Sequence, residues 1–270
     1  MKSFSLARGA LAALTLCSAF AQAAQVNQWT VDVNTIFIAS SILPGSGITN
    51  PNPTTLNWGT PTSANSGMDI LNSPSSETVF TNGAAVANVS VRHRNNPITG
   101  TTLTHVDIQS TVTLTALDPA GPTLPSAQIV FGIDFAETPN DPGIGNNCAN
   151  GAANGVGKNI NGCADIFAVS SDALNFLFNY DGQDYFISFF EQTSGLNPLS
   201  SAACLAATGS SNPCLGFETI EGQSTTVNFA TLITTERIDI NVPEPGSMSL
   251  VAGALLTLGF IGRRRRNRQG

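Results

Sequence analysis

Apolar and polar residues alternate with a period of two along most of the chain. The longest such stretch runs from His105 to Ala116, where Val106, Ile108 and Val112 fall on one side and threonines on the other. Successive side chains of a strand point to opposite faces, so the pattern predicts strands with one buried face. The expected strands are residues 29–34, 89–94, 105–116, 128–135, 164–169, 174–180, 185–189, 225–233 and 237–241.

Two pairs of neighbouring strands are expected to form hairpins. Asp181-Gly182 separates the aromatic-rich runs 174–180 and 185–189, and Asp-Gly between such runs is a strong signal for a tight turn. We expect these aromatic residues to anchor the core. The strands 89–94 and 105–116 flank a turn rich in Asn and Pro, and they are interpreted as a second hairpin.

The remaining central segments are interpreted as loops. Residues 41–76 are rich in Pro, Gly, Asn and Ser, which predicts a long surface loop with at most one short strand. Residues 137–162 are dense in Asn and Gly and are also expected to be a loop. No central stretch has a sustained period of 3.6. Short strands joined by turns therefore predict an all-β fold, an antiparallel β-sandwich of the jelly-roll or Ig-like kind.

The first residues have the features of a secretory signal peptide. Two basic residues precede an apolar run from Gly9 to Phe20, and Ala21-Gln22-Ala23 supplies the small residues of a cleavage site. We expect signal peptidase to cut between Ala23 and Ala24. Cys17 would instead suggest a lipoprotein, but a leucine precedes it where such signals need a small residue.

The last residues comprise a Pro-Glu-Pro sequence, an apolar run and a cluster of arginines. Pro243 and Pro245 have a fixed φ and no backbone N–H, so they hold Glu244 in a non-helical segment. As a helix, the run from Ser247 to Gly262 would be about 24 Å long, somewhat shorter than the roughly 30 Å hydrocarbon core of a membrane. The arginines at 263–268 would stay in the cytoplasm, which places the preceding domain outside.

This three-part arrangement resembles the PEP-CTERM sorting signal. The resemblance implies recognition of Pro243-Glu244-Pro245 by an exosortase, a membrane transpeptidase of Gram-negative bacteria that make exopolysaccharide. It also implies a transient stay in the inner membrane, followed by transfer to the cell surface or extracellular matrix. The alternative is an ordinary membrane anchor with a proline hinge. The expected organisation is a signal peptide at 1–23, an exported domain at 24–241 and the sorting signal at 242–270.

The expected exported part is acidic and sparsely charged. The chain has 11 Lys and Arg against 18 Asp and Glu, and outside the two ends only Arg92, Arg94, Lys158 and Arg237 are basic. Such a charge balance argues against binding to nucleic acid or to anionic lipid surfaces. Asn, Thr, Ser and Gly take many of the surface positions instead, which suits a secreted protein in a carbohydrate-rich setting.

Four cysteines remain after removal of the signal peptide: Cys148, Cys163, Cys204 and Cys214. An even number of cysteines in an exported chain indicates disulfides. Three pairings are possible, and we expect the local ones, Cys148–Cys163 and Cys204–Cys214. A structural zinc site is the alternative, but it usually uses close Cys-x-x-Cys pairs, which the sequence does not contain.

Candidate cation ligands gather at the end of the strand 128–135. Asp134, Glu137, Asn140 and Asp141 carry the hard oxygen atoms that Ca²⁺ prefers, although without the spacing of an EF-hand. A solvated acidic loop is one alternative. Another is that Asp134 and Glu137 form the carboxylate pair of a glycosidase. We therefore expect no resident cofactor, with calcium as the single candidate.

The two histidines are a further candidate site. His93 and His105 lie on the two strands of the second expected hairpin, and Asp107 shares a face with His105. If the histidines met across the hairpin, they could form a metal or acid–base site. Otherwise they belong to an ordinary polar face.

Recognisable nucleophile motifs are missing from the sequence. It contains no Gly-x-Ser-x-Gly motif, and its cysteines are expected in disulfides. We therefore expect a protein that is not an enzyme, a cell-surface or matrix protein associated with exopolysaccharide and biofilm. The alternatives are a calcium-assisted, lectin-like carbohydrate-binding module and a secreted glycosidase.

A second resemblance concerns the centre of the domain. Arg92-His93-Arg94-Asn95 is similar to the Thr-His-x-Asn motif that names a PEP-CTERM subfamily, with Arg92 in place of the threonine. Thr104-His105-Val106-Asp107 keeps the threonine and histidine but has Asp in place of Asn. The later Phe135-x-Glu137-Thr138-x-Asn140 and the paired cysteines are also similar to that group. The resemblance implies no particular activity.

Overall fold

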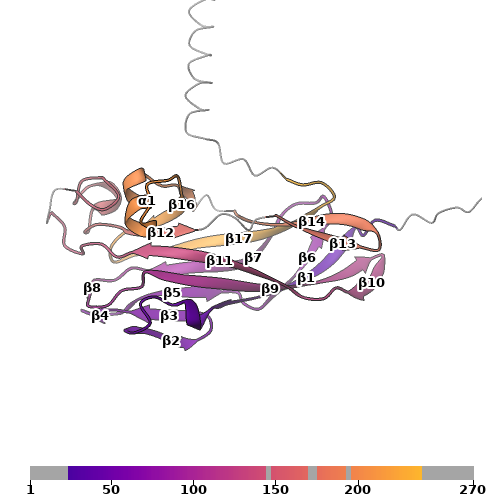
Figure 1. Cartoon of the computed structure of the whole chain (residues 1–270), viewed down its shortest axis with the longest axis horizontal. Coiled ribbons are helices and arrows are strands. Elements are labelled where there is room, and N and C mark those ends of the chain that lie inside the picture. Colours follow the sequence, from indigo (N-terminus) through magenta and orange to yellow (C-terminus); the bar gives the residue numbers. More distant parts are fainter. Residues whose placement is uncertain (1–23, 144–146, 170–174, 193–195, 239–270) are drawn as a thin grey trace, which may run out of the picture.

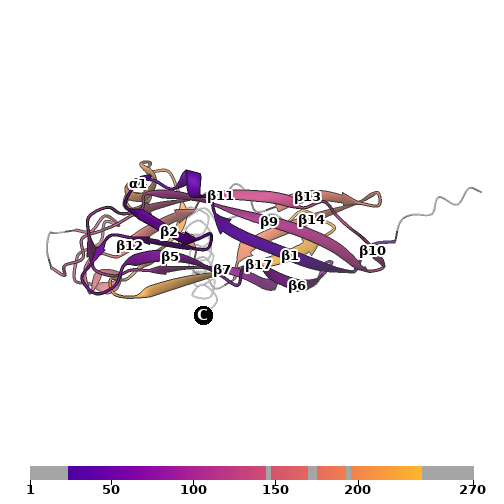
Figure 2. The same cartoon turned by 90° about the horizontal axis from the view of Figure 1, so that it is seen from below.

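The protein is an elongated sandwich of two antiparallel sheets (Figure 1). The computed structural model describes residues 24–143, 147–169, 175–192 and 196–238. The expected signal peptide at 1–23 and the sorting signal at 242–270 lie outside these residues. In a view from below, the long strands run along the long axis of the molecule (Figure 2).

The first sheet contains the longest strand and has β10 as a side branch on β9. Its main path follows the order β15 (Asn197–Pro198), β16 (Leu215–Thr219), β12 (Asp165–Val169), β11 (Ala127–Ala136), β9 (His105–Asp118), β1 (Gln28–Phe37) and β6 (Ser75–Phe80), and β10 is Ala120–Thr123.

The second sheet packs on the first. Its order is β13 (Asn175–Tyr180), β14 (Gln183–Glu191), β17 (Ser224–Thr234), β7 (Val86–Arg94), β5 (Ser66–Leu71), β3 (Thr55–Trp58) and β2 (Ile48–Asn52). A two-stranded ribbon and three short helices complete the described elements. They are β4 (Thr60–Pro61), β8 (Ile98–Thr99), α1 (Ser201–Thr208) and the 3₁₀ turns η1 (Ala39–Ser41) and η2 (Gly157–Asn159).

The period-two alternation matches the burial of the strands. In β9 the residues from Val106 to Ala116 are alternately buried and half-buried. The neighbouring strands β1 and β11 pair with β9 on either side in antiparallel register. The expected antiparallel sandwich is therefore confirmed.

The aromatic hairpin also forms as expected. Asp181 and Gly182 join β13 to β14 with positive φ values of 51° and 83°, the conformation that an Asp-Gly turn favours. Trp29 of β1 packs edge-on against Phe178 and Tyr185 of this hairpin, with ring centroids 5.4 and 5.2 Å apart. Edge-to-face packing brings the positive edge of one ring to the negative face of another. These aromatics anchor one end of the core.

The prediction of a second hairpin, formed by the strands 89–94 and 105–116, is wrong. β7 pairs with β17 and β5 in the second sheet, whereas β9 pairs with β1 and β11 in the first. The chain between them crosses from one sheet to the other. Alternation shows which face of a strand is buried, but it does not identify the neighbouring strand, and this is why the error arose.

The interpretation of residues 41–76 as a long loop is also wrong. This segment contains β2, β3, β4, β5 and the first residues of β6. Leu56, Trp58 and Met68 are fully buried there. Pro51 is tolerated in β2 because this strand lies at a sheet edge, where a missing N–H breaks no interior hydrogen bond. The expected strand 237–241 is not formed at Arg237 and Ile238, and its other residues lie outside those described.

Two disulfides form at one end of the molecule, with the pairing expected. Cys148–Cys163 has a Cα–Cα distance of 5.4 Å, and Cys204–Cys214 has one of 5.8 Å. The second bridge begins on α1, a helix that the sequence pattern did not predict. Ser200 caps this helix by accepting a hydrogen bond from the Ala203 N–H at 3.0 Å. Eight residues are too few for a clear periodic pattern.

The hydrophobic core divides into two clusters. One, which we call the disulfide-end cluster, includes Trp58, Phe135 and Phe167. The other, the hairpin-end cluster, includes Trp29 and Tyr185. A pocket of about 400 Å³ lies between the sheets and is lined by members of both clusters.

Candidate functional site

Three acidic residues converge at the disulfide end of the sandwich. Asp165 begins β12, Glu137 follows the last residue of β11, and Glu221 follows β16. Strand pairing brings them together, because β12 lies between β11 and β16. Ala136 of β11 is opposite Ile166, and Thr219 of β16 is opposite Asp165. We call Glu137, Asp165 and Glu221 the acidic cluster.

Two members of the acidic cluster, Asp165 and Glu137, accept hydrogen bonds from neighbouring groups, whereas the carboxyl oxygens of Glu221 have no partner among the described residues. The backbone N–H and the hydroxyl of Thr138 donate to Asp165 Oδ1 at 2.9 and 3.1 Å. The indole N–H of Trp58 donates to Glu137 Oε2 at 3.3 Å. Glu137 and Asp165 are close enough for their charges to interact. Two carboxylates in such proximity repel each other, which favours a proton on one of them.

His93 of β7 faces the acidic cluster from the second sheet. Its ring is fully buried against Trp58, Phe135 and Phe167, and it lies nearly parallel to the indole at a centroid distance of 5.8 Å. Neither ring nitrogen has a hydrogen-bond partner among the described residues. His93 is therefore part of the aromatic core as well as a neighbour of the acids.

Burial shifts the pKa values in this cluster strongly. Desolvation, with the nearby Glu221 charge, raises the pKa of Glu137 from 4.5 to about 7. Desolvation likewise raises the pKa of Glu221 to about 7, and burial followed by the Glu137 charge raises the pKa of Asp165 well above its usual value. Burial and the Arg94 charge lower the pKa of His93. Near neutral pH the cluster therefore retains protons while His93 is uncharged.

The burial of these groups limits their chemistry. Asp165 is fully buried and Glu221 is 2 % exposed, so neither carboxyl can contact a polymeric substrate in this conformation. Among the described residues, no group of three or more His, Cys, Asp or Glu side chains is arranged to hold a metal ion. The arrangement is suited to sharing protons between carboxyl groups inside the fold.

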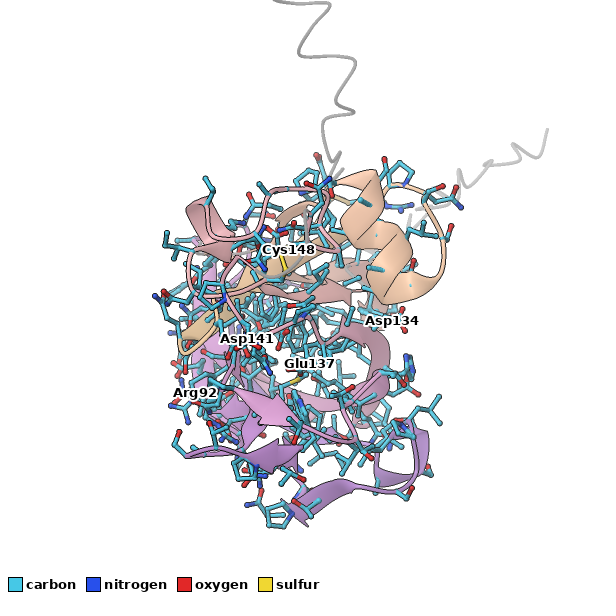
Figure 3. The ribbon with its side chains drawn as sticks, turned by 90° about the vertical axis from the view of Figure 1, so that its left-hand side faces the viewer. Arg92, Asp134, Glu137, Asp141 and Cys148 are labelled. Carbon is cyan, nitrogen blue, oxygen red and sulfur yellow. A yellow bond between two sulfur atoms is a disulfide. The ribbon has the colours of Figure 1, made fainter. Side chains whose placement is uncertain are left out.

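The four predicted calcium ligands point to different surroundings. Asp134 lies on the outer face of β11 and accepts a 2.7 Å hydrogen bond from His105 Nδ1. Glu137 belongs to the acidic cluster, and Asn140 donates to the Ile98 carbonyl at 2.7 Å. The backbone carbonyl of Asp141 accepts from Asn154 at 3.0 Å. Figure 3 shows Asp134 apart from Glu137 and Asp141.

The separation follows from strand geometry. Asp134 and Glu137 are three positions apart, and residues an odd number of positions apart point to opposite faces of an extended chain. Neither a joint calcium loop nor a glycosidase pair is formed by Asp134 and Glu137 in the described structure. Calcium binding stays a prediction, without a preformed site among the described residues.

The two histidines do not form a joint site. His93 is inside the sandwich, whereas His105 is on the outer face of the first sheet, because β7 and β9 belong to different sheets. Asp107 does share a face with His105 as expected, with Oδ1 3.2 Å from Nε2. Gly132 gives this group room, since a Cβ there would lie 3.0 Å from His105 Cε1.

Asp165 and Glu221 were missed by the sequence analysis. The signal that could have found them is the second family resemblance, because its residues surround the acidic cluster. His93 and Asn95 approach from β7 and the segment after it, and Asn95 donates to the Thr219 carbonyl at 2.9 Å. Glu137 and Thr138 belong to the other motif. Thr138 donates a hydrogen bond to Asp165, and burial together with the Glu137 charge raises the pKa of Asp165.

Comparison with known families identifies the C-terminal segment. The model of the PEP-CTERM protein-sorting motif matches residues 241–266. The chain therefore carries a PEP-CTERM sorting motif. The match does not extend to the central domain and does not confirm the Thr-His-x-Asn subtype. None of the curated proteins compared with the chain is similar to it.

The PEP-CTERM motif marks the chain for an exosortase and for secretion to the cell surface of a Gram-negative bacterium. Within the described residues no helix is long and apolar enough to span a membrane. The expected apolar helix at 247–262, like Ala23 and the Pro243-Glu244-Pro245 sequence, lies outside the described residues. Ala24 is the first residue described and is exposed.

Proposed function

We propose that this PEP-CTERM protein is a non-enzymatic component of the cell surface or extracellular matrix that associates with exopolysaccharide in a biofilm. In this proposal signal peptidase removes residues 1–23, and the apolar segment 247–262 holds the chain in the inner membrane until an exosortase processes it. The observation that carries the proposal is the sorting motif directly after a disulfide-bonded sandwich.

The outer face of the first sheet is the surface that we assign to polysaccharide contact. Most of its side chains are hydroxyls, amides and carboxylates, the groups that hydrogen-bond to sugars, although the exposed Val130 and the half-buried Ile36 are apolar. Strand register places Asn34 beside Thr111, and Thr111 beside Gln128. We call this the outer polar face, comprising Asp32, Asn34, Asp107, Gln109, Thr111, Thr113, Gln128 and Asp134.

The burial of the acidic cluster supports a role without catalysis. Glycoside cleavage needs two carboxyl groups on either side of a bound sugar. Asp165 and Glu221 are inside the core, and Asp134 is engaged with His105 on the opposite side of the sheet from Glu137. Binding by the outer polar face needs no such pair.

The proposal is tested by co-sedimentation of the processed protein, purified from its host, with the host's exopolysaccharide. We expect retention by the polymer, and Thr111→Ala together with Asn34→Ala should reduce it by about threefold or more, the effect of roughly one lost hydrogen bond. Thr226→Ala, an exposed position on β17 of the other sheet, is the matched control.

Two further arms distinguish the alternatives. Retention that requires calcium and is abolished by a chelator would favour the lectin-like module. Turnover of chromogenic glycosides that is lost in Glu137→Gln would overturn the non-enzymatic role. Absence of any retention would overturn the association with exopolysaccharide.

A further inference from the structure

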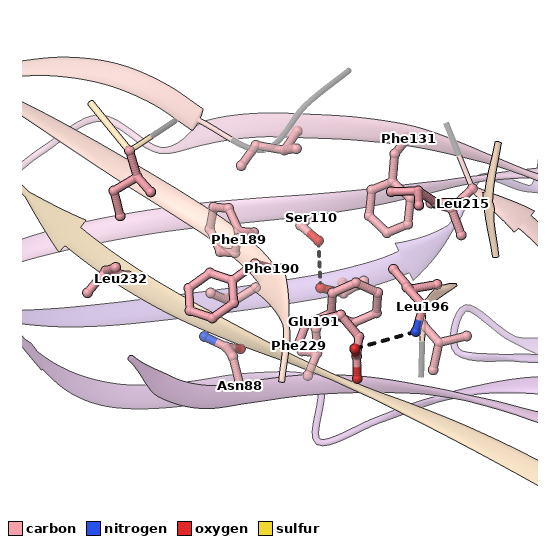
Figure 4. Close-up of a pocket in the computed structure, with 17 residues that line it drawn as sticks. Asn88, Ser110, Phe131, Phe189, Phe190, Glu191, Leu196, Leu215, Phe229 and Leu232 are labelled. Carbon is pink, nitrogen blue, oxygen red and sulfur yellow. Dashed lines mark hydrogen bonds between the residues drawn. The ribbon is translucent and has the colours of Figure 1, made fainter. Parts of the chain in front are cut away.

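The pocket between the sheets is apolar and lies where the two core clusters meet. Figure 4 shows its lining, which comes from β1, β7, β9, β11, β12, β14, β16 and β17. Val91 belongs to the disulfide-end cluster, whereas Val33 and Ile129 belong to the hairpin-end cluster. The close packing typical of protein interiors is therefore interrupted in the middle of this sandwich.

Aromatic and aliphatic side chains make up most of the pocket wall. Phe131, Phe189, Phe190 and Phe229 line it and are each only half-buried. Leu196, Leu215 and Leu232 add branched aliphatic surface. Walls of this kind offer few hydrogen bonds to water or to a sugar, and comparable apolar cavities bind apolar ligands.

Three polar side chains in the wall have hydrogen-bond partners within the protein. Thr35 Oγ1 and Ser110 Oγ are 2.8 Å apart and share a hydrogen bond. The amide of Asn88 donates to Thr231 Oγ1 at 3.2 Å and accepts from Ser75. These groups are satisfied without a ligand, so a polar ligand would gain little from them.

Glu191 is the one acidic residue in the pocket lining. Its Oε2 accepts a hydrogen bond from the Leu196 N–H at 3.4 Å. A ligand with an anionic end group would have to bury its charge against apolar side chains, which costs far more free energy than burying an uncharged end. The wall therefore selects against fatty-acid anions as well as against sugars.

We propose that this pocket binds one uncharged aliphatic chain, such as that of a medium-length alcohol. The volume of about 400 Å³ falls within the roughly 300–1,000 Å³ of small-molecule sites. This ligand is distinct from the polysaccharide of the proposed function and occupies a different surface. Failure of one assignment leaves the other standing.

The position of the pocket along the chain indicates the source of the ligand. Ile238, at the end of the described chain, is part of the lining, and residues 239–246 connect it to the apolar segment 247–262. Eight residues span at most about 29 Å when fully extended. While that segment is in the membrane, as proposed above, the pocket stays within this distance of the lipid, so we assign the membrane as the source of the chain.

Binding is measured with decan-1-ol and the processed protein, by native mass spectrometry and isothermal titration calorimetry. We expect one bound alcohol per chain, and decanoate at pH 8 should bind about tenfold more weakly because its carboxylate is costly to bury in an apolar pocket. Mass spectra of the protein before any addition show whether a chain has co-purified and would need to be exchanged. Absence of both a co-purified chain and a decan-1-ol complex would overturn the proposal.

Two neighbouring residues of β11 provide a matched pair of variants. Ile129 points into the pocket, whereas Val130 is 47 % exposed on the other face. Ile129→Trp should abolish binding of decan-1-ol, and Val130→Trp should leave it unchanged. Leu232→Phe is a milder filling variant if Ile129→Trp does not fold. Equal binding by the folded filling variant and the wild type would overturn the location.

A final experiment tests whether the protein takes its ligand from a membrane. Vesicles of phosphatidylcholine are loaded with deuterated decan-1-ol, incubated with the protein and removed by centrifugation. Protein that carries the deuterated alcohol supports extraction from a membrane. Binding from solution but not from vesicles would overturn the membrane as the source.

Discussion

His93 Nε2 lies 3.9 Å from Asp165 Oδ2, and the two side chains come from opposite sheets. Burial lowers the pKa of His93 and raises that of Asp165, so burial opposes the charged form of both groups. An ion pair between these two side chains is therefore disfavoured inside the core. The contact makes the packing of the two sheets sensitive to protons at this end.

Stability should depend on pH through Glu221. Its folded pKa of about 7 is above the ordinary value of 4.5, so the stability it contributes is complete below about pH 4.5 and is lost as the pH rises through about 7. Glu221→Gln places an uncharged side chain of similar shape at this position at every pH. Its melting temperature at pH 8 should exceed that of the wild type by about 2–4 °C or more, the shift for roughly 1 kcal/mol in a domain of this size.

His93 contributes a pH dependence of stability that is opposite in sign to that of Glu221. Because its folded pKa is below the ordinary 6.5, its contribution is lost as the pH falls below about 6.5. The wild type should consequently be most stable under mildly acidic conditions. Thermal unfolding monitored by circular dichroism from pH 4.5 to 8 checks both statements, with the exposed Glu236→Gln as the control. Parallel pH profiles for Glu221→Gln and wild type would contradict the assignment.

Removal of the second disulfide should destabilise the domain. Cys204→Ser with Cys214→Ser opens a loop with a sequence separation of 10, and the expected loss is about 2–3 kcal/mol in the free energy of unfolding. Denaturant titration of the double variant measures this loss. Limited proteolysis should then cut between β15 and β16, where the bridge holds α1. An unchanged titration midpoint would show that this loop is stable without the bridge.

Truncation of Trp29 should destabilise the other end of the core. The fully buried indole packs on three aromatic rings and donates to Thr81 Oγ1 at 3.0 Å. Trp29→Ala should lower the free energy of unfolding by about 3–5 kcal/mol. Leu177→Ala, a 60 % exposed position on β13, is a control that should change it by less than about 0.5 kcal/mol. Urea denaturation of both variants provides the measurement.

Processing should depend on Glu244. Glu244→Ala alters the Pro-Glu-Pro sequence within the matched motif, so the chain should accumulate in the inner membrane with its C-terminal segment attached. Immunoblots of membrane, surface and medium fractions follow its size and location. If the variant reached the surface at the size of the wild type, this glutamate would not be needed for sorting.

The sequence pattern showed which face of a strand is buried and which turns and disulfides form between residues close together in the chain. The buried side of β9, the Asp181-Gly182 turn and both disulfide pairings could be predicted because each depends on residues close together in the chain. Strand partners could not, as β7 and β9 show. Pairing between strands is decided by the packing of the whole sandwich.

The acidic cluster could not be predicted either, because it depends on which strands pair. Asp165 and Glu221 are separated by more than fifty residues, and the pairing of β12 with β16 brings them together. Each acid alone resembles a surface residue in the sequence. Residues 41–76 misled in the opposite way, because an edge strand such as β2 accepts the Pro and Asn residues that are typical of loops.

The place of Ile238 has a mechanical consequence. This residue leaves the sandwich beside the pocket between the two core clusters, and thus at neither end of the long axis. In the proposed function, the linker to the membrane would therefore leave the sandwich between its two ends, so that the disulfide end and the aromatic end both extend away from the attachment point. Each end could then contact a different neighbour while the chain is held at the membrane.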